Sequence, residues 1–226
     1  MLCKTSAAIF QRLSNHSELY PETIDESLNL EMLNKVKEKL AVPLNKSARL
    51  LHQVGFTPIM ASLLGLFSAL VSGAAYFSTR YLSDMIYPAL GFLLLSGFLD
   101  AVDGAMARLY SKVTRFGGIL DSVSDRIEEI AVLTGIVAGG LVSAPIGLSA
   151  LAGSIMVSYV RARAESEGVD MSGVGFAERP ERLIILAGAT ALRQMEIGVL
   201  VIAVVAWVTV AQRMMHAYRR LRRLEE

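Results

Sequence analysis

Long apolar runs are the feature that most constrains this chain. A helix that crosses a lipid bilayer needs about 20 mostly apolar residues, and six stretches approach or reach that length. They are residues 58–77, 86–109, 117–142, 144–163, 180–192 and 197–217. None of them shows the alternation typical of a strand, and hydrocarbon favours helices, whose backbone polar groups are satisfied internally. The sequence therefore predicts an all-α protein built as a six-span transmembrane helix bundle.

Composition agrees with a membrane protein. Hydrophobic residues make up 53% of the chain and the mean hydropathy is +0.47, whereas soluble domains contain about 45–50% apolar residues. The net charge of +1 gives no reason to expect a nucleic-acid partner. The single Cys3 excludes an internal disulfide, and His16, His52 and His216 lie too far apart to suggest a metal site.

Basic residues predict the orientation of the bundle. Eighteen lysines and arginines precede the first span, follow the second and fourth, or lie in the C-terminal tail, whereas the other three loops hold only Arg80 and Arg193. Loops rich in lysine and arginine stay in the cytoplasm. We therefore expect a multi-pass protein of the cell membrane with both termini and the site on the cytoplasmic side.

The N-terminal region divides into two parts. Residues 1–31 are polar and contain no apolar core of a secretory signal, so we expect a loosely ordered leader, and Met32 is an alternative start. Residues 32–56 interleave leucines with lysines, which is typical of an amphipathic helix lying at the membrane interface, here broken near Pro43. An ordinary solvated linker is the alternative. Residues 57–226 then form the transmembrane catalytic domain.

Acidic residues cluster at the ends of two adjacent spans. Asp100 and Asp103 lie three residues apart near the end of the second span and share a helix face. Asp121 and Asp125 lie four apart at the start of the third span and form one stripe with Gly117. The connection between the spans is short, which favours antiparallel neighbours, so we expect four carboxylates around one cavity.

Four carboxylates together need positive charge. Charged groups in or near a bilayer are costly and like charges repel, so they must be protonated, paired with cations or bound to metal. Oxygen ligands suit Mg²⁺, Mn²⁺ or Ca²⁺ rather than zinc. Two such ions bridged by carboxylates would suit phosphoryl chemistry. A set of salt bridges at helix ends, without chemistry, is the alternative.

The acidic stretch resembles the signature of the CDP-alcohol phosphotransferase family, D-x2-D-G-x2-A-R-x8-G-x3-D-x3-D. Every position of that signature is present, at Asp100, Asp103, Gly104, Ala107, Arg108, Gly117, Asp121 and Asp125. Eight fixed residues over 26 positions make a very specific pattern. The six-span plan also matches, so the resemblance covers roughly residues 32–223.

The resemblance implies a homodimeric enzyme with a cavity open to the cytoplasm. It implies that the four aspartates hold two Mg²⁺ or Mn²⁺ ions and that Asp125 is the general base. It places the CDP-activated lipid on Asp100, Asp103, Gly104, Ala107, Arg108, Gly117 and Asp121. An acceptor hydroxyl would then attack the lipid-bearing phosphorus and release CMP, while the lipid chains stay in the membrane.

A second group of basic residues concerns the acceptor. Arg161, Arg182 and Arg213 lie at the cytoplasmic ends of three spans, with Arg163 and Arg179 as further candidates. Arginine forks bind phosphate oxygens, so we expect a phosphorylated alcohol as the acceptor. Positive-inside topology alone is the alternative reading of these arginines.

The stretches RARAE and ERPERLII resemble the branch of the family that uses inositol 1-phosphate. That branch includes bacterial phosphatidylinositol phosphate synthases and archaeal archaetidylinositol phosphate synthases, so CDP-diacylglycerol and CDP-archaeol are both candidate donors. Members often carry lysine where Arg161 stands. Glycerol 3-phosphate is the alternative acceptor. A membrane cation transporter or a structural membrane adaptor is a more remote alternative, and the absence of an inverted repeat in the sequence argues against a transporter.

Overall fold

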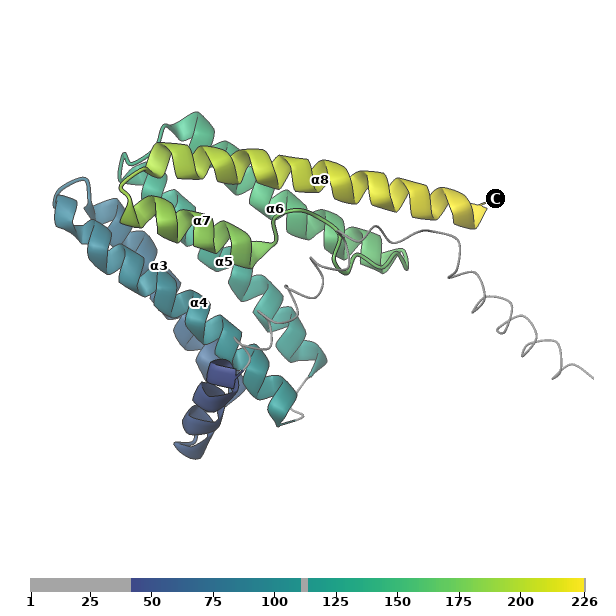
Figure 1. Ribbon diagram of the computed structural model, residues 1–226, viewed down its shortest axis with the longest axis horizontal. Coiled ribbons are helices and arrows are strands. Elements are labelled where there is room, and N and C mark those ends of the chain that lie inside the picture. The colour runs from purple at the N-terminus through teal and green to yellow at the C-terminus, as the bar shows by residue number, and fades with distance from the viewer. Residues whose placement is uncertain (1–41, 111–113, 226) are drawn as a thin grey trace, which may run out of the picture. The chain divides into compact units, whose positions relative to one another are not determined.

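The structure is a computed structural model that describes residues 42–110 and 114–225, and this described part is helical throughout. Contacts divide the chain into two units, residues 1–46 and 47–226. A helix covers residues 42–53, with Pro43 in its first turn. The helices that follow are α3 (Pro58–Ser78), the short η2 (Ser83–Met85), α4 (Ile86–Leu109), α5 (Arg115–Ala138), α6 (Ala144–Ser166), α7 (Arg179–Ala191) and α8 (Met195–Glu225) (Figure 1).

These helices lie where the apolar runs predicted them, with ends shifted by a few residues. The leader and residues 32–41 of the expected amphipathic helix lie outside the described residues. The start of α3 is as expected, because Thr57 caps the helix, accepts a hydrogen bond from the Met60 amide, and precedes a proline in the first turn. Thr114 caps α5 in the same way and accepts a hydrogen bond of 2.9 Å from the Gly117 amide.

Four helical segments of the described residues are long and apolar enough to cross a membrane. They are Pro58–Ser78, Ser83–Leu109, Ala144–Ser166 and Met195–Arg223. The expected count of six is therefore not confirmed by length and composition. The reasons are local: α5 carries five charged residues between Asp121 and Glu129, and α7 has only 13 residues. These two helices also carry the candidate residues Asp121, Asp125, Arg179 and Arg182.

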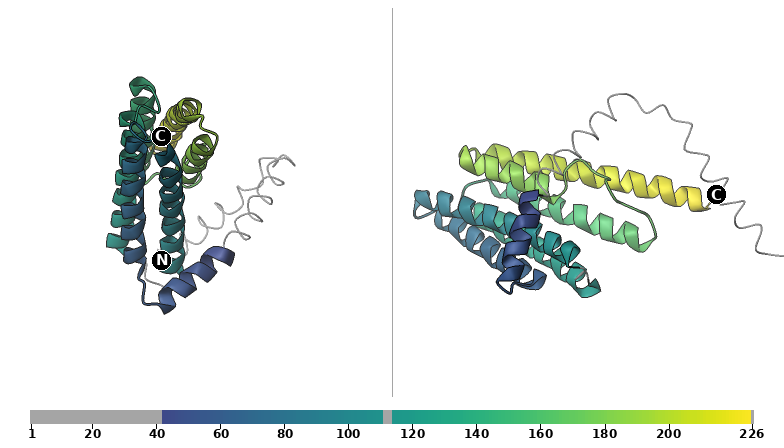
Figure 2. Two further views of the ribbon diagram at one scale, coloured as in Figure 1. Left: turned by 90° about the vertical axis from the view of Figure 1, so that its left-hand side faces the viewer. Right: turned by 60° about the horizontal axis from the view of Figure 1, so that its bottom comes forward.

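Within the second unit, α3 is the central packing partner of the first half. It packs along both α4 and α5. In the second half, α6 and α7 both pack against α8 (Figures 1 and 2). The two halves are joined by contacts of α5 with α6 and of α4 with α7. The short connection predicted that α4 and α5 are neighbours, and their side chains do meet, since Ser96 of α4 donates a hydrogen bond of 2.7 Å to Glu128 of α5. Among the described residues their backbones do not pack closely over an extended length, whereas α3 packs along both of them.

Three glycines allow α3 and α5 to approach with their backbones almost in contact. A Cβ atom on Gly135 would lie 2.1 Å from the carbonyl oxygen of Gly73, and one on Gly139 would lie 2.3 Å from that of Tyr76. A Cβ atom on Gly73 would lie 2.5 Å from the carbonyl oxygen of Ala131. Small residues permit this kind of approach between membrane helices. The contact fixes where the acidic start of α5 lies relative to α3 and α4.

Replacing Gly135 with alanine tests this contact. Because the added methyl group meets backbone rather than a movable side chain, we expect a loss of about 1–3 kcal/mol, as for other overpacked sites. Thermal unfolding in detergent should show a clearly lower midpoint for Gly135→Ala. Gly91→Ala is the matched control, since a Cβ atom on Gly91 meets nothing within 4 Å. Equal midpoints for the two variants would contradict the close packing of α3 and α5.

Candidate active site

Three carboxylates from two helices meet at one point. Asp100 and Asp103 of α4 and Asp121 of α5 each offer an oxygen atom within 4.8 Å of the others. Ser62 of α3 donates a hydrogen bond of 2.5 Å to Oδ2 of Asp103, and Asp103 is only 5% exposed. The end of α4 and the start of α5 thus bring their acidic faces together.

Asp125 lies apart from this group of three. Its Oδ1 atom is 2.7 Å from Nη1 of Arg179, and its Oδ2 atom is 3.3 Å from Nη1 of Arg126. The Oδ1 atom is buried and accepts no hydrogen bond of good geometry from the described residues. The sequence predicted four carboxylates around one cavity, and the structure brings three together with the fourth turned toward an arginine.

This donor set fits a divalent cation. The three clustered oxygens are hard ligands, and three acidic side chains are costly to hold together when Arg179, at 2.7 Å from Asp100, is the basic partner in contact with them. The buried Oδ1 atom of Asp125 is a further oxygen that lacks a hydrogen bond. Asp100, Asp103 and Asp121 are therefore the residues that could hold such an ion. Asp125, on the same face of α5 as Asp121, could supply a further ligand.

A cavity lies beside the end of α4 and the start of α5. Its volume is about 610 Å³, and α3 contributes one wall. Residues of the sequence signature line it, namely Asp103, Gly104, Ala107, Arg108, Gly117 and Asp121, together with Thr57, Ser62 and Thr114. The guanidinium of Arg108 lies over Gly104, where an added Cβ atom would be 3.3 Å from Nη1. The small residues thus leave room for a ligand of nucleotide size next to the carboxylates.

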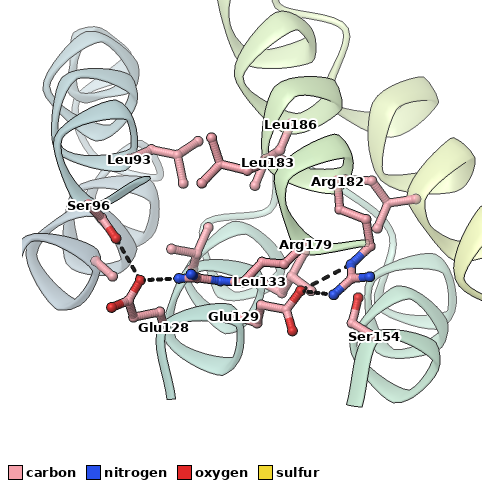
Figure 3. A pocket seen from close by; sticks show the side chains of 13 residues that line it. Leu93, Ser96, Glu128, Glu129, Leu133, Ser154, Arg179, Arg182, Leu183 and Leu186 are labelled. Carbon is pink, nitrogen blue, oxygen red and sulfur yellow. Dashed lines mark hydrogen bonds and ion pairs between the residues drawn. The ribbon is translucent and has the colours of Figure 1, made fainter. Parts of the chain in front are cut away.

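Arg179, the first residue of α7, joins the acidic residues of α4 and α5. Its Nη1 atom lies 2.7 Å from Asp100 Oδ2 and 2.7 Å from Asp125 Oδ1. Its Nη2 atom donates a hydrogen bond to Glu128, whose Oε2 atom also accepts one of 2.7 Å from Ser96 (Figure 3). One guanidinium therefore contacts three carboxylates.

The remaining candidate arginines are paired with glutamates. Arg182 is 4% exposed, and its Nη2 atom lies 2.6 Å from Glu129 Oε1 (Figure 3). Arg213, which is 2% exposed, and Arg161 both face Glu178, with nitrogen–oxygen distances of 3.3 and 3.9 Å. Arg213 and Arg161 thus converge on one glutamate.

The outlying candidate is Arg163. It is exposed and pairs with Glu167 at 2.5 Å within the same helix. That contact is an ordinary pair of residues four apart on a helix surface, so the structure does not bring Arg163 to the other arginines.

Three glutamates that organise this region were not predicted from the sequence, namely Glu128, Glu129 and Glu178. A signal existed for Glu128, because it lies three residues after Asp125 and so continues the stripe of Asp121 and Asp125 along α5. Glu129 and Glu178 carried no comparable signal. Their roles depend on where α7 and α8 lie, which no spacing within one helix reveals.

A bundle with apolar helices and a cavity lined by carboxylates beside buried arginines has the features of a membrane enzyme that acts on phosphate esters. The chain belongs to the CDP-alcohol phosphatidyltransferase family, whose pattern matches residues 57–217. Members of this family are transferases, and the match covers α3 to α7 completely and most of α8.

Two relatives define the comparison further. The archaetidylinositol phosphate synthase of Pyrococcus horikoshii is 40% identical over 84% of this chain and 98% of its own. The crystal structure of the phosphatidylinositol phosphate synthase of Mycobacterium tuberculosis with CDP-DAG bound is 30% identical, with a TM-score of 0.67 over 77% of this chain and 93% of that one. The same enzyme has also been crystallised in complex with manganese and citrate, again at a TM-score of 0.67 and 30% identity.

The Arg182–Glu129 pair yields a prediction about stability. Replacing Glu129 with glutamine leaves a buried guanidinium without its carboxylate, and breaking a buried pair in this way costs about 3 kcal/mol or more. We expect a marked fall in the midpoint of thermal unfolding. The control is Glu165→Gln, which breaks the exposed pair with Arg161 and should leave the midpoint within about a degree or two, since exposed pairs contribute about 0–1 kcal/mol. Similar midpoints for both variants would show that Arg182 is not buried against Glu129.

Proposed function

We propose that this enzyme transfers a phosphatidyl or archaetidyl group from a CDP-activated lipid to inositol 1-phosphate and releases CMP. The observation that carries the proposal is the carboxylate-lined cavity together with a separate group of arginines, of which Arg182 and Arg213 are buried. A cavity with small walls suits the donor nucleotide, and the arginines suit a phosphorylated acceptor. Relatives that bear the names of inositol phosphate synthases, from an archaeon at 40% identity and from a mycobacterium at 38%, support the choice of acceptor.

The proposal assigns each side chain a task. Asp100, Asp103 and Asp121, with Asp125, hold two divalent ions, Mg²⁺ or Mn²⁺. When bound, such ions neutralise charge on the diphosphate and on the departing CMP. Gly104, Ala107 and Gly117 make room for the nucleotide, and Arg108 supports it with positive charge. The mycobacterial relative crystallised with manganese supports the metal assignment.

Asp125 is the proposed general base. In the proposed step it accepts the proton of the acceptor hydroxyl, whose oxygen forms a bond to the lipid-bearing phosphorus as the bond to the CMP oxygen breaks. The position of Asp125 supports this role, because it shares the Arg179 guanidinium with Asp100, at the border between the acidic cluster and the arginine-rich side. Holding both substrates in line supplies much of the rate.

The acceptor phosphate is proposed to bind among Arg161, Arg182 and Arg213, with Arg179 at the border. These arginines already hold carboxylates of Glu129 and Glu178, and a phosphate is bound by the same donors. Binding of the acceptor would therefore replace or share at least one of these contacts. Glu178 is the most accessible of the two glutamates, with a side chain 43% exposed.

The proposal also covers the membrane arrangement. We infer six spans, with α5 and α7 crossing beside the four apolar helices and shielded by them, and a homodimer in the membrane. The bias of basic residues supports a cytoplasmic active site and cytoplasmic termini. Residues 32–56 are proposed to lie at the cytoplasmic interface as an amphipathic segment, after a polar leader of residues 1–31. Residues 57–226 then form the catalytic domain.

The acceptor is tested by measuring CMP release from the purified protein in detergent. CDP-diacylglycerol and CDP-archaeol are each offered with inositol 1-phosphate or with glycerol 3-phosphate, in the presence of Mg²⁺ or Mn²⁺ and after chelation. We expect metal-dependent release with inositol 1-phosphate and little with glycerol 3-phosphate. A preference for glycerol 3-phosphate would identify it as the acceptor in place of inositol 1-phosphate. CMP release without metal would contradict the proposed metal-binding role of the aspartates.

Asp125→Asn tests the general base. Because asparagine keeps the shape but cannot accept the proton, we expect turnover to fall by about 10²–10⁴-fold, while CDP-lipid binding measured by calorimetry stays within a few-fold. Asp170→Asn, on an exposed loop, should leave both unchanged. Turnover within tenfold of the parent enzyme would remove Asp125 as the base.

Arg161→Gln tests the acceptor site at its most exposed arginine. Losing one phosphate contact should raise the KM for inositol 1-phosphate by about tenfold, which corresponds to one charge-assisted hydrogen bond of 1.4 kcal/mol or more. The KM for CDP-lipid should change little. Arg219→Gln, in the basic tail, serves as the control for a general loss of positive charge. An equal rise in both KM values would place Arg161 outside the acceptor site.

A further inference from the structure

The contacts of Arg179 go beyond what a phosphate ligand alone would need. Its Nη1 atom lies 2.7 Å from both Asp100 and Asp125, which stand on different helices. Its side chain is only 15% exposed. The guanidinium therefore occupies the space between two of the four aspartates that the family signature assigns to metal, and it supplies the closest positive charge to both.

Glu128 holds the other side of the same guanidinium. It is 5% exposed, accepts hydrogen bonds from Arg179 and from Ser96 of α4, and faces Gly65 of α3, where a Cβ atom would lie 3.7 Å from Oε1. It does not belong to the group of three clustered carboxylates. A buried carboxylate that two donors fix in this way is a rigid anchor. Arg179 thus has one fixed partner, Glu128. Its other two partners, Asp100 and Asp125, are also proposed ligands of the divalent ions.

We propose that Arg179, anchored on Glu128, is a positioning residue that acts as an internal counter-cation of the acidic cluster and is displaced from Asp100 and Asp125 when divalent ions bind. This inference rests on the proposed function, because it takes both aspartates as metal ligands. A carboxylate oxygen cannot accept both a close guanidinium and a metal ion at full strength, so the two cations compete. Glu128 keeps Arg179 beside the site after displacement and limits how far it moves.

Arg179 reduces the repulsion between the four aspartates of the site. Asp100, Asp103, Asp121 and Asp125 carry four negative charges in a partly buried place, and without an ion they would repel one another. Arg179 offsets part of this repulsion and so stabilises the metal-free protein. By linkage, whatever stabilises the metal-free form weakens metal binding by the same factor. Removing Arg179 should therefore tighten metal binding while it destabilises the metal-free protein.

The test is a titration of the purified full chain with Mn²⁺ in detergent, without substrates, with free Mn²⁺ measured by electron paramagnetic resonance. We expect Arg179→Gln to bind Mn²⁺ at least about fivefold more tightly than the parent, the lower end of typical couplings between sites. Arg179→Lys, which keeps the charge but loses the fork, should shift affinity in the same direction by less. Glu128→Gln should weaken Mn²⁺ binding, because Arg179 then pairs with the aspartates alone.

A double variant separates this device from a general electrostatic effect. If Glu128 acts through Arg179, the double variant Glu128→Gln with Arg179→Gln should bind Mn²⁺ as Arg179→Gln does. If the two charges acted on the site independently, the changes in the free energy of Mn²⁺ binding caused by the two substitutions would instead add. Arg163→Gln is the control for a general loss of positive charge, since Arg163 is exposed and pairs with Glu167 outside the cluster. Its affinity for Mn²⁺ should stay within twofold of the parent.

The outcomes test the role of Arg179 separately from the proposed metal site. Unchanged or weaker Mn²⁺ binding by Arg179→Gln, or additive effects in the double variant, would overturn the counter-cation inference and leave the proposed function standing. If Arg179→Gln cannot be purified, Glu128→Gln and Arg179→Lys still decide it through their opposite shifts. Failure of the parent protein to bind Mn²⁺ at all would contradict the metal site of the proposed function, and with it this inference.

Discussion

Repulsion between carboxylates is the constraint on which this structure depends. Asp100, Asp103 and Asp121 offer oxygens within 4.8 Å of one another, and Asp125 lies beside them against Arg179. Such an arrangement persists only where the surrounding protein holds the helices in place and supplies positive charge. The glycine contact of α3 with α5 provides the first, since it fixes the two backbones at a distance that admits no side chain between them. Arg179 provides the second.

The same constraint explains why two helices are less apolar than the others. Charged residues on α5 and at the start of α7 face one another in the interior, where Glu128 meets Arg179 and Glu129 meets Arg182 (Figure 3). Buried pairs of this kind contribute little net stability, but losing one partner is costly. They are therefore better understood as devices that fix the position of α7, and with it the arginines that begin the acceptor side, than as a source of stability.

The helices could be predicted well from the sequence because each depends on residues within its own stretch of the chain. Apolar length located α3, α4, α6 and α8, and the Thr57-Pro58 pair gave the start of α3. Helical spacing placed Asp100 with Asp103, and Asp121 with Gly117, on shared faces. The short connection predicted α4 and α5 as neighbours, but it did not reveal that α3 packs along both of them or that a cavity lies beside their ends.

What the sequence did not reveal is the partner of each arginine. The basic residues stood out by their position at helix ends, but Glu129 and Glu178 became their partners only through the packing of α7 and α8 onto the bundle. Ser62 likewise reaches Asp103 from a helix that carries no other sign of the site. Contacts between helices far apart in the chain depend on tertiary packing, which periodicity within one helix does not encode.

The central claim is that the facing ends of α4 and α5 form one site for divalent cations. The most direct measurement is anomalous diffraction from crystals of this protein grown with Mn²⁺. Peaks within bonding distance of Asp100, Asp103 and Asp121, with Asp125 turned away from Arg179 toward them, are the predicted result. Strong anomalous peaks elsewhere and none at these carboxylates would contradict the account.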